Sequence, residues 1–208
     1  MLRFLHLLFP PREDEQILCG ISLDEFISLV APKLIGATHP DAVSLLPFGD
    51  TRVRATIHEA KYHGNTYAFK LLAFALSEYL RESDEIYRKV RLIPIPLGRE
   101  RRKERGFNQI EEVVSRALRN LSDEGAHSYV LHTDILIRTR ETSSQVSLPR
   151  EARKKNMRNA FVARESLDPT YTYIVIDDVL TTGATLQAAI GALKEAGALN
   201  IVPLALAH

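Results

Sequence analysis

Cysteine is nearly absent from this chain: among its 208 residues, Cys19 is the only one. A single thiol excludes an intrachain disulfide and any zinc site built from several cysteines. Such a composition is typical of proteins from a reducing compartment. We therefore expect a cytoplasmic protein.

Long apolar runs are missing as well. The stretch from Leu2 to Phe9 is apolar, but Arg3 and His6 interrupt it and no small-residue cleavage site follows. A membrane-spanning helix needs about 18 or more consecutive apolar residues, and a signal peptide needs the cleavage site. Neither a membrane span nor a signal peptide is predicted.

A large excess of one charge is also missing, because the net charge is only +1. This balance gives no global argument for binding to nucleic acid or membranes, although it leaves local patches open. The patterns G-x-x-x-x-G-K-[ST] and G-x-G-x-x-G do not occur. The two commonest nucleotide-binding loops are therefore not predicted.

The chain does contain alternating strand and helix patterns, which predict an α/β fold: a mainly parallel sheet flanked by helices, with its ligand at the carboxyl ends of the strands. Helices are predicted at 50–62, 66–81, from 108 onward and at 149–157. Strands are predicted at 90–96, 134–138, 160–163, 173–176 and 201–206. Residues 97–105 are expected to form a basic loop. Residues 1–48, which several prolines interrupt, are expected to form a small appendage to a domain over 49–208.

The most informative stretch runs from Tyr173 to Thr185 and reads Y-I-V-I-D-D-V-L-T-T-G-A-T. Its four leading apolar residues predict a strand buried on both faces. A continuing strand would drive Asp177 or Asp178 into a packed layer as an unpaired charge, so we expect the strand to end there. An amphipathic helix follows the small, hydroxyl-rich loop.

That loop suits a phosphate, because backbone N–H groups at a helix N-terminus lack intrahelical partners and Gly183 permits a positive φ. Carboxylates repel a phosphate, but they accept hydrogen bonds from a diol or hold hydrated Mg²⁺. Asp177 and Asp178 beside this loop therefore suggest a ribose 5-phosphate. The alternative is an ordinary α/β edge loop with solvated acids.

The same stretch resembles the binding motif for 5-phosphoribosyl-1-pyrophosphate (PRPP) of type I phosphoribosyltransferases. Two more segments are similar to the ComF family of competence-associated, phosphoribosyltransferase-like proteins: I-P-I-P-L-G-R-E-R-R-K-E-R-G-F-N-Q at 93–109, and the segment 138–161 with T-S-S-Q-V-S-L and R-K-K-N-M-R-N-A-F. Lys61-Tyr62-His63-Gly64 resembles the K-Y-x-G of that family. The likeness extends from about residue 45 to the C-terminus.

Many ComF-like proteins begin with a zinc module built on C-x-x-C pairs. Cys19 has no pair, so we expect a variant without that module and without zinc. The seven histidines lack metal-ligand spacing, and each is expected to lie on the surface or on a helix: His6, His39, His58, His63, His127, His132 and His208.

The resemblance implies roles for particular residues. Asp177 and Asp178 would be catalytic and would bind PRPP, with its Mg²⁺, together with Thr181, Thr182, Gly183, Ala184 and Thr185. Leu97, Gly98 and Arg99 would form the pyrophosphate loop, and Thr142, Gln145, Arg153 and Asn156 a flexible loop that closes over the site. Alternatively, the cations of 99–105 form a solvated face, and Gln145 and Asn156 brace their own loop.

Two functions remain open. A phosphoribosyltransferase would displace pyrophosphate from ribose C1 by an unidentified acceptor, through an oxocarbenium-like transition state. A non-catalytic, PRPP-binding accessory factor of DNA uptake would contact single-stranded DNA or competence and recombination proteins. A second basic cluster favours the latter: Arg150, Arg153, Lys154, Lys155 and Arg158. Because only Phe107 and Phe161 could stack bases nearby, DNA binding is expected to be weak and salt-sensitive.

Overall fold

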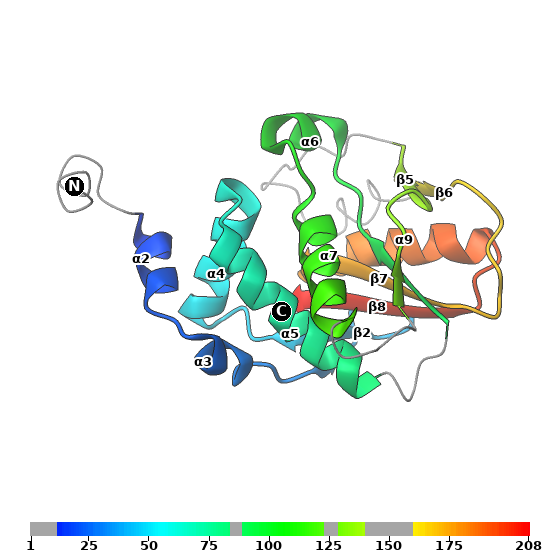
Figure 1. Ribbon diagram of the computed structural model, residues 1–208. Coiled ribbons are helices and arrows are strands. Elements are labelled where there is room, and N and C mark those ends of the chain that lie inside the picture. Colours follow the sequence, from blue (N-terminus) through cyan, green and yellow to red (C-terminus); the bar gives the residue numbers. More distant parts are fainter. Residues whose placement is uncertain (1–11, 84–88, 123–128, 140–159) are drawn as a thin grey trace.

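A computed structural model describes residues 12–83, 89–122, 129–139 and 160–208 (Figure 1). Its helices are α2 (Glu13–Cys19), α3 (Leu23–Ile27), α4 (Thr51–His63), α5 (Thr66–Ser83), α6 (Arg99–Arg105), α7 (Gln109–Ser122) and α9 (Ala184–Glu195). Its strands are β1 (Lys33–Ile35), β2 (Ala42–Leu46), β3 (Val90–Pro94), β4 (Tyr129–Leu131), β5 (Leu136–Arg138), β6 (Phe161–Ala163), β7 (Thr172–Val179) and β8 (Asn200–Ala207). None of the described helices is both long and apolar enough to cross a membrane.

Six strands form one sheet in the order β1-β2-β8-β7-β3-β4. All neighbours are parallel except β1, which is antiparallel to β2. The carboxyl ends of the five parallel strands therefore lie at the same edge of the sheet. Strands β5 and β6 form a separate antiparallel pair.

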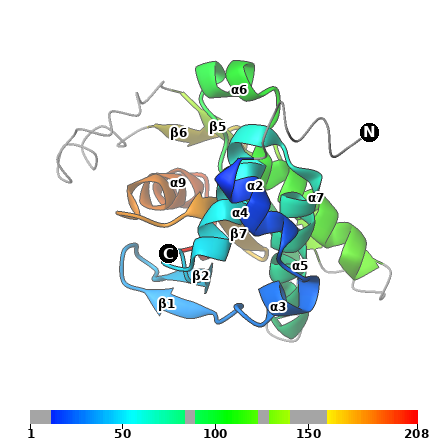
Figure 2. The same cartoon turned by 90° about the vertical axis from the view of Figure 1, so that its left-hand side faces the viewer.

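Helices cover both faces of this sheet: α9 lies on one face, and α4, α5 and α7 lie on the other (Figure 2). Residues of β7 alternate between the two cores, since Ile174 and Ile176 pack with α4, α5 and α7, whereas Tyr173 and Val175 pack with α9. The predicted α/β fold with a mainly parallel, helix-flanked sheet is confirmed, and it is consistent with a type I phosphoribosyltransferase-like fold.

Capping residues fix the limits of α4 and α5, as their sequence predicts. Asp50 Oδ1 accepts a hydrogen bond from the Arg52 amide at 2.9 Å, and α4 ends at Gly64 in the left-handed conformation. The Asn65 side chain accepts from the Tyr67 amide and so begins α5. Only a few residues therefore separate the two helices, and α4 has a fixed end.

The prediction of a basic loop over residues 97–105 is wrong, because Arg99–Arg105 form α6. Its arginine, glutamate and lysine residues all favour a helix, and Gly106 closes it in the left-handed conformation. Strand β4 is not predicted from the sequence at all.

The N-terminal segment contributes to the sheet. Whether residues 1–48 form a separate appendage stays a prediction, but β1 and β2 lie within this range and β2 is hydrogen-bonded to β8. The expected flexible-loop residues Thr142, Gln145, Arg153 and Asn156, the helix at 149–157 and the second basic cluster lie outside the described residues.

Gly183 is the position where this N-terminal segment meets the predicted phosphate loop. Its φ is +73°, and a Cβ atom added there would lie 2.9 Å from the carbonyl carbon of Ala37, with the carbonyl oxygen closer still. The connection between β1 and β2 is also tied to α9, since Gln187 Oε1 accepts from the His39 amide at 2.8 Å. Only glycine fits this contact.

We expect Gly183→Ala to lower the free energy of unfolding by about 2 kcal/mol or more, because the new methyl group meets backbone and the positive φ is itself strained. Gly191→Ala is the matched control on the same helix. No atom lies within 4 Å of a Cβ added there, so this change should stabilise the protein by about 0.5–1 kcal/mol. Urea denaturation measures both, and equal effects would contradict the close contact.

Candidate functional site

The acidic pair lies within β7, not after it. We predicted that the strand ends at Asp177, but Asp177 pairs with Ala205 and Val179 with Ala207 of β8. The prediction is wrong because it assumed that a buried carboxylate would lack a partner, and Asp178 has partners. The two acids therefore point to opposite faces of the sheet.

Asp178 is held by three hydrogen bonds. Lys61 Nζ and Gln109 Nε2 each lie 2.7 Å from Asp178 Oδ2, and the Val179 amide donates to Oδ1 at 2.8 Å. Asp178 is only 8% exposed. Pairing with a cation and hydrogen bonds to both oxygens compensate for its burial.

Asp177 lies on the other face, the face that α9 covers. Its Oδ1 accepts from the Asp178 amide at 2.9 Å, and its other oxygen accepts no hydrogen bond within the described residues. Burial and the neighbouring Asp178 charge raise the pKa of Asp177 to about 7, although Lys61 and Arg138 oppose the shift. Asp177 is thus the acid with an oxygen available to a hydroxyl group or a metal ion.

The loop from Thr181 to Thr185 leads from β7 into α9. Thr181 is exposed, and the N-cap Gly183 is buried in its contact with Ala37. The Thr182 hydroxyl accepts from the Ala184 amide at 3.4 Å. The first amides of the helix therefore lie at the sheet edge that carries the acids, as a phosphate-binding loop requires.

The expected pyrophosphate loop lies at the same edge. β3 is the parallel neighbour of β7, and the Ile95 amide donates to the Ile176 carbonyl at 2.8 Å. The chain then runs through half-buried Leu97 and buried Gly98, the N-cap of α6, to exposed Arg99. Adjacent strands thus bring both predicted phosphate segments beside the acidic pair.

The R-G-F-N-Q segment packs against the K-Y-x-G segment. The Arg105 guanidinium lies 4.9 Å from the Tyr62 ring centre, and a Cβ on Gly64 would lie 3.3 Å from the Phe107 ring. Asn108 caps α7 and donates to the Ile95 carbonyl at 3.0 Å. The two segments, far apart in the sequence, therefore bring Lys61 and Gln109 to the same carboxylate oxygen.

Three residues of this site have no role assigned from the sequence: Lys61, Gln109 and Arg138. The sequence shows the motifs that contain these residues, but it does not show which carboxylates the residues approach in the folded protein. Arg138 Nη1 lies 3.5 Å from the Pro96 carbonyl, on the Asp177 side of the sheet. It adds a cation near the expected pyrophosphate loop.

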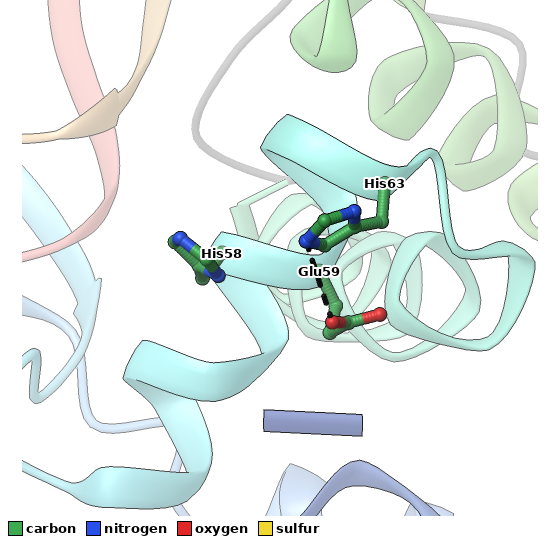
Figure 3. Close-up of side chains that lie close together, drawn as sticks. All are labelled: His58, Glu59 and His63. Carbon is green, nitrogen blue, oxygen red and sulfur yellow. Dashed lines mark ion pairs between the residues drawn. The ribbon is translucent and has the colours of Figure 1, made fainter. Parts of the chain in front are cut away.

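A second cluster on α4 has the residue types of a metal site (Figure 3). The ligand atoms of His58, Glu59 and His63 lie within 4.8 Å of one another. However, Arg12 donates to both oxygens of the fully buried Glu59 at 2.9 Å. A metal ion would have to displace this guanidinium.

The cluster is better described as an anchor of α2. His58 Nδ1 lies 2.8 Å from Asp14, and Asn65 donates to Glu59 at 3.2 Å. Burial raises the pKa of Glu59, but the bonds from Arg12 and Asn65 outweigh it and leave that pKa lowered. These contacts also hold the end of α4 that carries Lys61.

Curated relatives match most of this chain, although no family model matches the sequence. Competence protein ComFC of Streptococcus pneumoniae is 29% identical over 68% of this chain and 56% of its own length. DNA utilization protein YhgH of Shigella flexneri is 30% identical over 70% and 62% of the respective chains. Its counterpart of the same name in Escherichia coli K12 is 31% identical over 62% and 56%. The chain thus spans less than two thirds of the length of these relatives.

Replacing Asp177 with Asn should make stability less dependent on pH. Because the folded-state pKa of Asp177 is raised to about 7, the folded protein keeps a proton that the unfolded chain loses above about pH 4. The contribution of Asp177 to the free energy of unfolding therefore falls as the pH rises from about 4 to 7. We expect Asp177→Asn to be about 1–3 kcal/mol more stable than the wild type at pH 8 and nearly equal at pH 4.

Urea denaturation at a series of pH values measures this difference. Asp168→Asn is the control of opposite sign, because hydrogen bonds from Thr170 lower the pKa of Asp168. That variant should be less stable than the wild type at neutral pH, and its deficit should shrink as the pH falls through that lowered pKa. A pH-independent difference for Asp177→Asn would contradict the raised pKa.

Proposed function

Because the chain belongs to the ComF family, we propose that it binds PRPP with Mg²⁺ and transfers the phosphoribosyl group to an acceptor with release of pyrophosphate. The observation that carries this proposal is the meeting of three segments at one sheet edge: the acidic pair, the Thr181–Thr185 loop and the Leu97–Arg99 loop. PRPP carries a ribose diol, a 5-phosphate and a pyrophosphate, so each segment has a chemical counterpart in it.

The 5-phosphate would bind at the start of α9. Amides of its first turn and the hydroxyls of Thr181, Thr182 and Thr185 supply donors without requiring a full cationic charge. The close contact of Gly183 with Ala37 supports a fixed loop conformation. A fixed loop loses little conformational entropy on binding.

The ribose hydroxyls would face the acidic pair, and the pyrophosphate would face Gly98 and Arg99. A carboxylate oxygen accepts hydrogen bonds from a hydroxyl group, whereas arginine donates two parallel bonds to phosphate oxygens. Arg138 supports the same end of the ligand from β5. Bound Mg²⁺ would neutralise part of the pyrophosphate charge as that group leaves.

The chemistry assigned to the protein is electrostatic. Breaking the bond between ribose C1 and pyrophosphate develops positive charge on the sugar and negative charge on the leaving group. A carboxylate near the ribose favours the first charge, and the guanidinium groups of Arg99 and Arg138 favour the second. The described residues do not point to a base for the acceptor.

Calorimetry with PRPP and Mg²⁺ tests binding. We expect heat of binding for the wild type and a loss of affinity of about 100-fold or more for Asp177→Ala with Asp178→Ala, since charge-assisted hydrogen bonds contribute about 1.5–3 kcal/mol each. Pyrophosphate release over a panel of amines and nucleobases tests turnover. No heat with folded wild type at millimolar PRPP would rule out the site, and binding without release would leave an accessory role.

A second candidate function is contact with single-stranded DNA, in line with relatives that are named for competence and DNA utilization. The observation in its favour is an exposed aromatic ring beside the cationic helix α6: Tyr62 is 55% exposed, the half-buried Arg105 lies over its ring, and Arg102 and Lys103 are exposed. A ring and cations together can stack a base and hold its phosphates. This patch supplies an aromatic residue that sequence analysis did not assign to the basic segment.

Replacing Arg101, Arg102 and Lys103 with Ala should weaken DNA binding and lower the slope of log affinity against log salt, by about 0.7 for each phosphate that the protein no longer neutralises. Tyr62→Ala should weaken binding with little change of slope. Lys33→Ala, on β1 and far from α6 (Figure 2), is the control. Fluorescence anisotropy with labelled single-stranded DNA measures all three, and unchanged affinity in the triple variant would exclude this patch.

A further inference from the structure

We propose that the two acids of β7 have different tasks: Lys61 and Gln109 hold Asp178 as a positioning carboxylate, and Asp177 alone contacts the ligand. The first half concerns the protein by itself. The second half rests on the proposed function, because it specifies which acid meets the ribose and its Mg²⁺. Lys61 and Gln109 are then positioning residues of the site.

The occupancy of the carboxylate oxygens supports this division. Both oxygens of Asp178 already accept hydrogen bonds, two of them at 2.7 Å, and its side chain is only 12% exposed. A hydroxyl group or Mg²⁺ that binds Oδ2 would have to displace Lys61 or Gln109, whereas Oδ1 already accepts the Val179 amide. Among the described residues, Asp177 accepts a single bond, from the neighbouring amide, so none of them has to move for a ligand to reach its second oxygen.

The direction of the side chains supports it as well. Side chains of consecutive strand residues point to opposite faces, and Asp178 points toward α4 and α7, where Lys61 and Gln109 lie. Asp177 points to the face packed by α9, whose N-terminal loop is the candidate phosphate site. A sugar phosphate bound at that loop lies on the Asp177 side of the sheet.

The charge balance gives Lys61 its role. Two adjacent ionised carboxylates repel each other, which disfavours the ionisation of both at once. With Asp178 paired to Lys61, Asp177 is the acid of the pair that has no ion-pair partner among the described residues. Lys61 can do this because the Gly64–Phe107 contact and the Glu59 cluster hold the end of α4.

A double-mutant cycle in urea tests the first half without any ligand. Lys61→Met leaves a buried carboxylate unpaired and should lower stability strongly, as should Asp178→Asn. The double variant should lose less stability than the two single variants lose in sum, and the coupling between the two changes should be about tenfold or more in the unfolding equilibrium constant. We call the paired Lys61 and Asp178 the clamp. Additive effects of the two changes would contradict an interaction between these residues.

Calorimetry with PRPP and Mg²⁺ on folded variants tests the second half. Asp177→Asn should weaken binding by about 30-fold or more, whereas Asp178→Asn should weaken it by about threefold or less. The pair Lys61→Met with Asp178→Asn removes both charges of the clamp and should bind PRPP better than Lys61→Met alone. A purely structural role of Lys61 predicts no such recovery in folded protein.

The outcomes separate the two proposals. If wild type binds PRPP and Asp178→Asn loses as much affinity as Asp177→Asn, the division of tasks is overturned and the proposed function stands. If wild type does not bind PRPP, the proposed function and the ligand role of Asp177 are both overturned. In that case the stability cycle still decides whether Lys61 clamps Asp178.

Discussion

The pairing of Lys61 with Asp178 is the interaction on which the rest of the site depends. An ionised carboxylate at 8% exposure is stable only if a cation and hydrogen bonds replace its water. Lys61 lies in the last turn of α4 and Gln109 is the first residue of α7, so the end of one helix and the start of the other meet at this carboxylate. Helices from distant parts of the sequence are thereby placed against the same atom of the central strand.

The contacts around the pair serve this placement. Gly64 ends α4 in a conformation that L-residues adopt rarely, and its lack of a side chain admits the Phe107 ring. Asn108 joins the start of α7 to the carbonyl after β3. Because β3 is hydrogen-bonded to β7, the expected pyrophosphate loop, the clamp and the acids form one connected unit. A change at Gly64 or Phe107 would therefore reach the acids without touching them.

Local patterns predicted much of the fold, and long-range contacts explain what they missed. The apolar run at Tyr173–Ile176, the cap at Asp50 and the periodicity after Asn108 each act within a few residues, so the sequence reveals them. The continuation of β7 through its acids places Asp178 against Lys61, which lies far away in the sequence, and no local rule contains this pairing. Short strands such as β4 owe their conformation to a neighbouring strand rather than to their own residues.

The continuation of the strand past its acids also explains why the site is asymmetric. If the strand ended at Asp177, both carboxylates could turn toward solvent and would be equivalent. Inside the strand they must face opposite layers, and within the described residues only Asp178 has hydrogen-bond partners on both of its oxygens. The remaining cost falls on the half-buried Asp177, since burial and the neighbouring Asp178 charge both raise its pKa. A cation or hydroxyl group bound there would relieve that cost, so the least stable feature of the unliganded site is the one that a ligand stabilises.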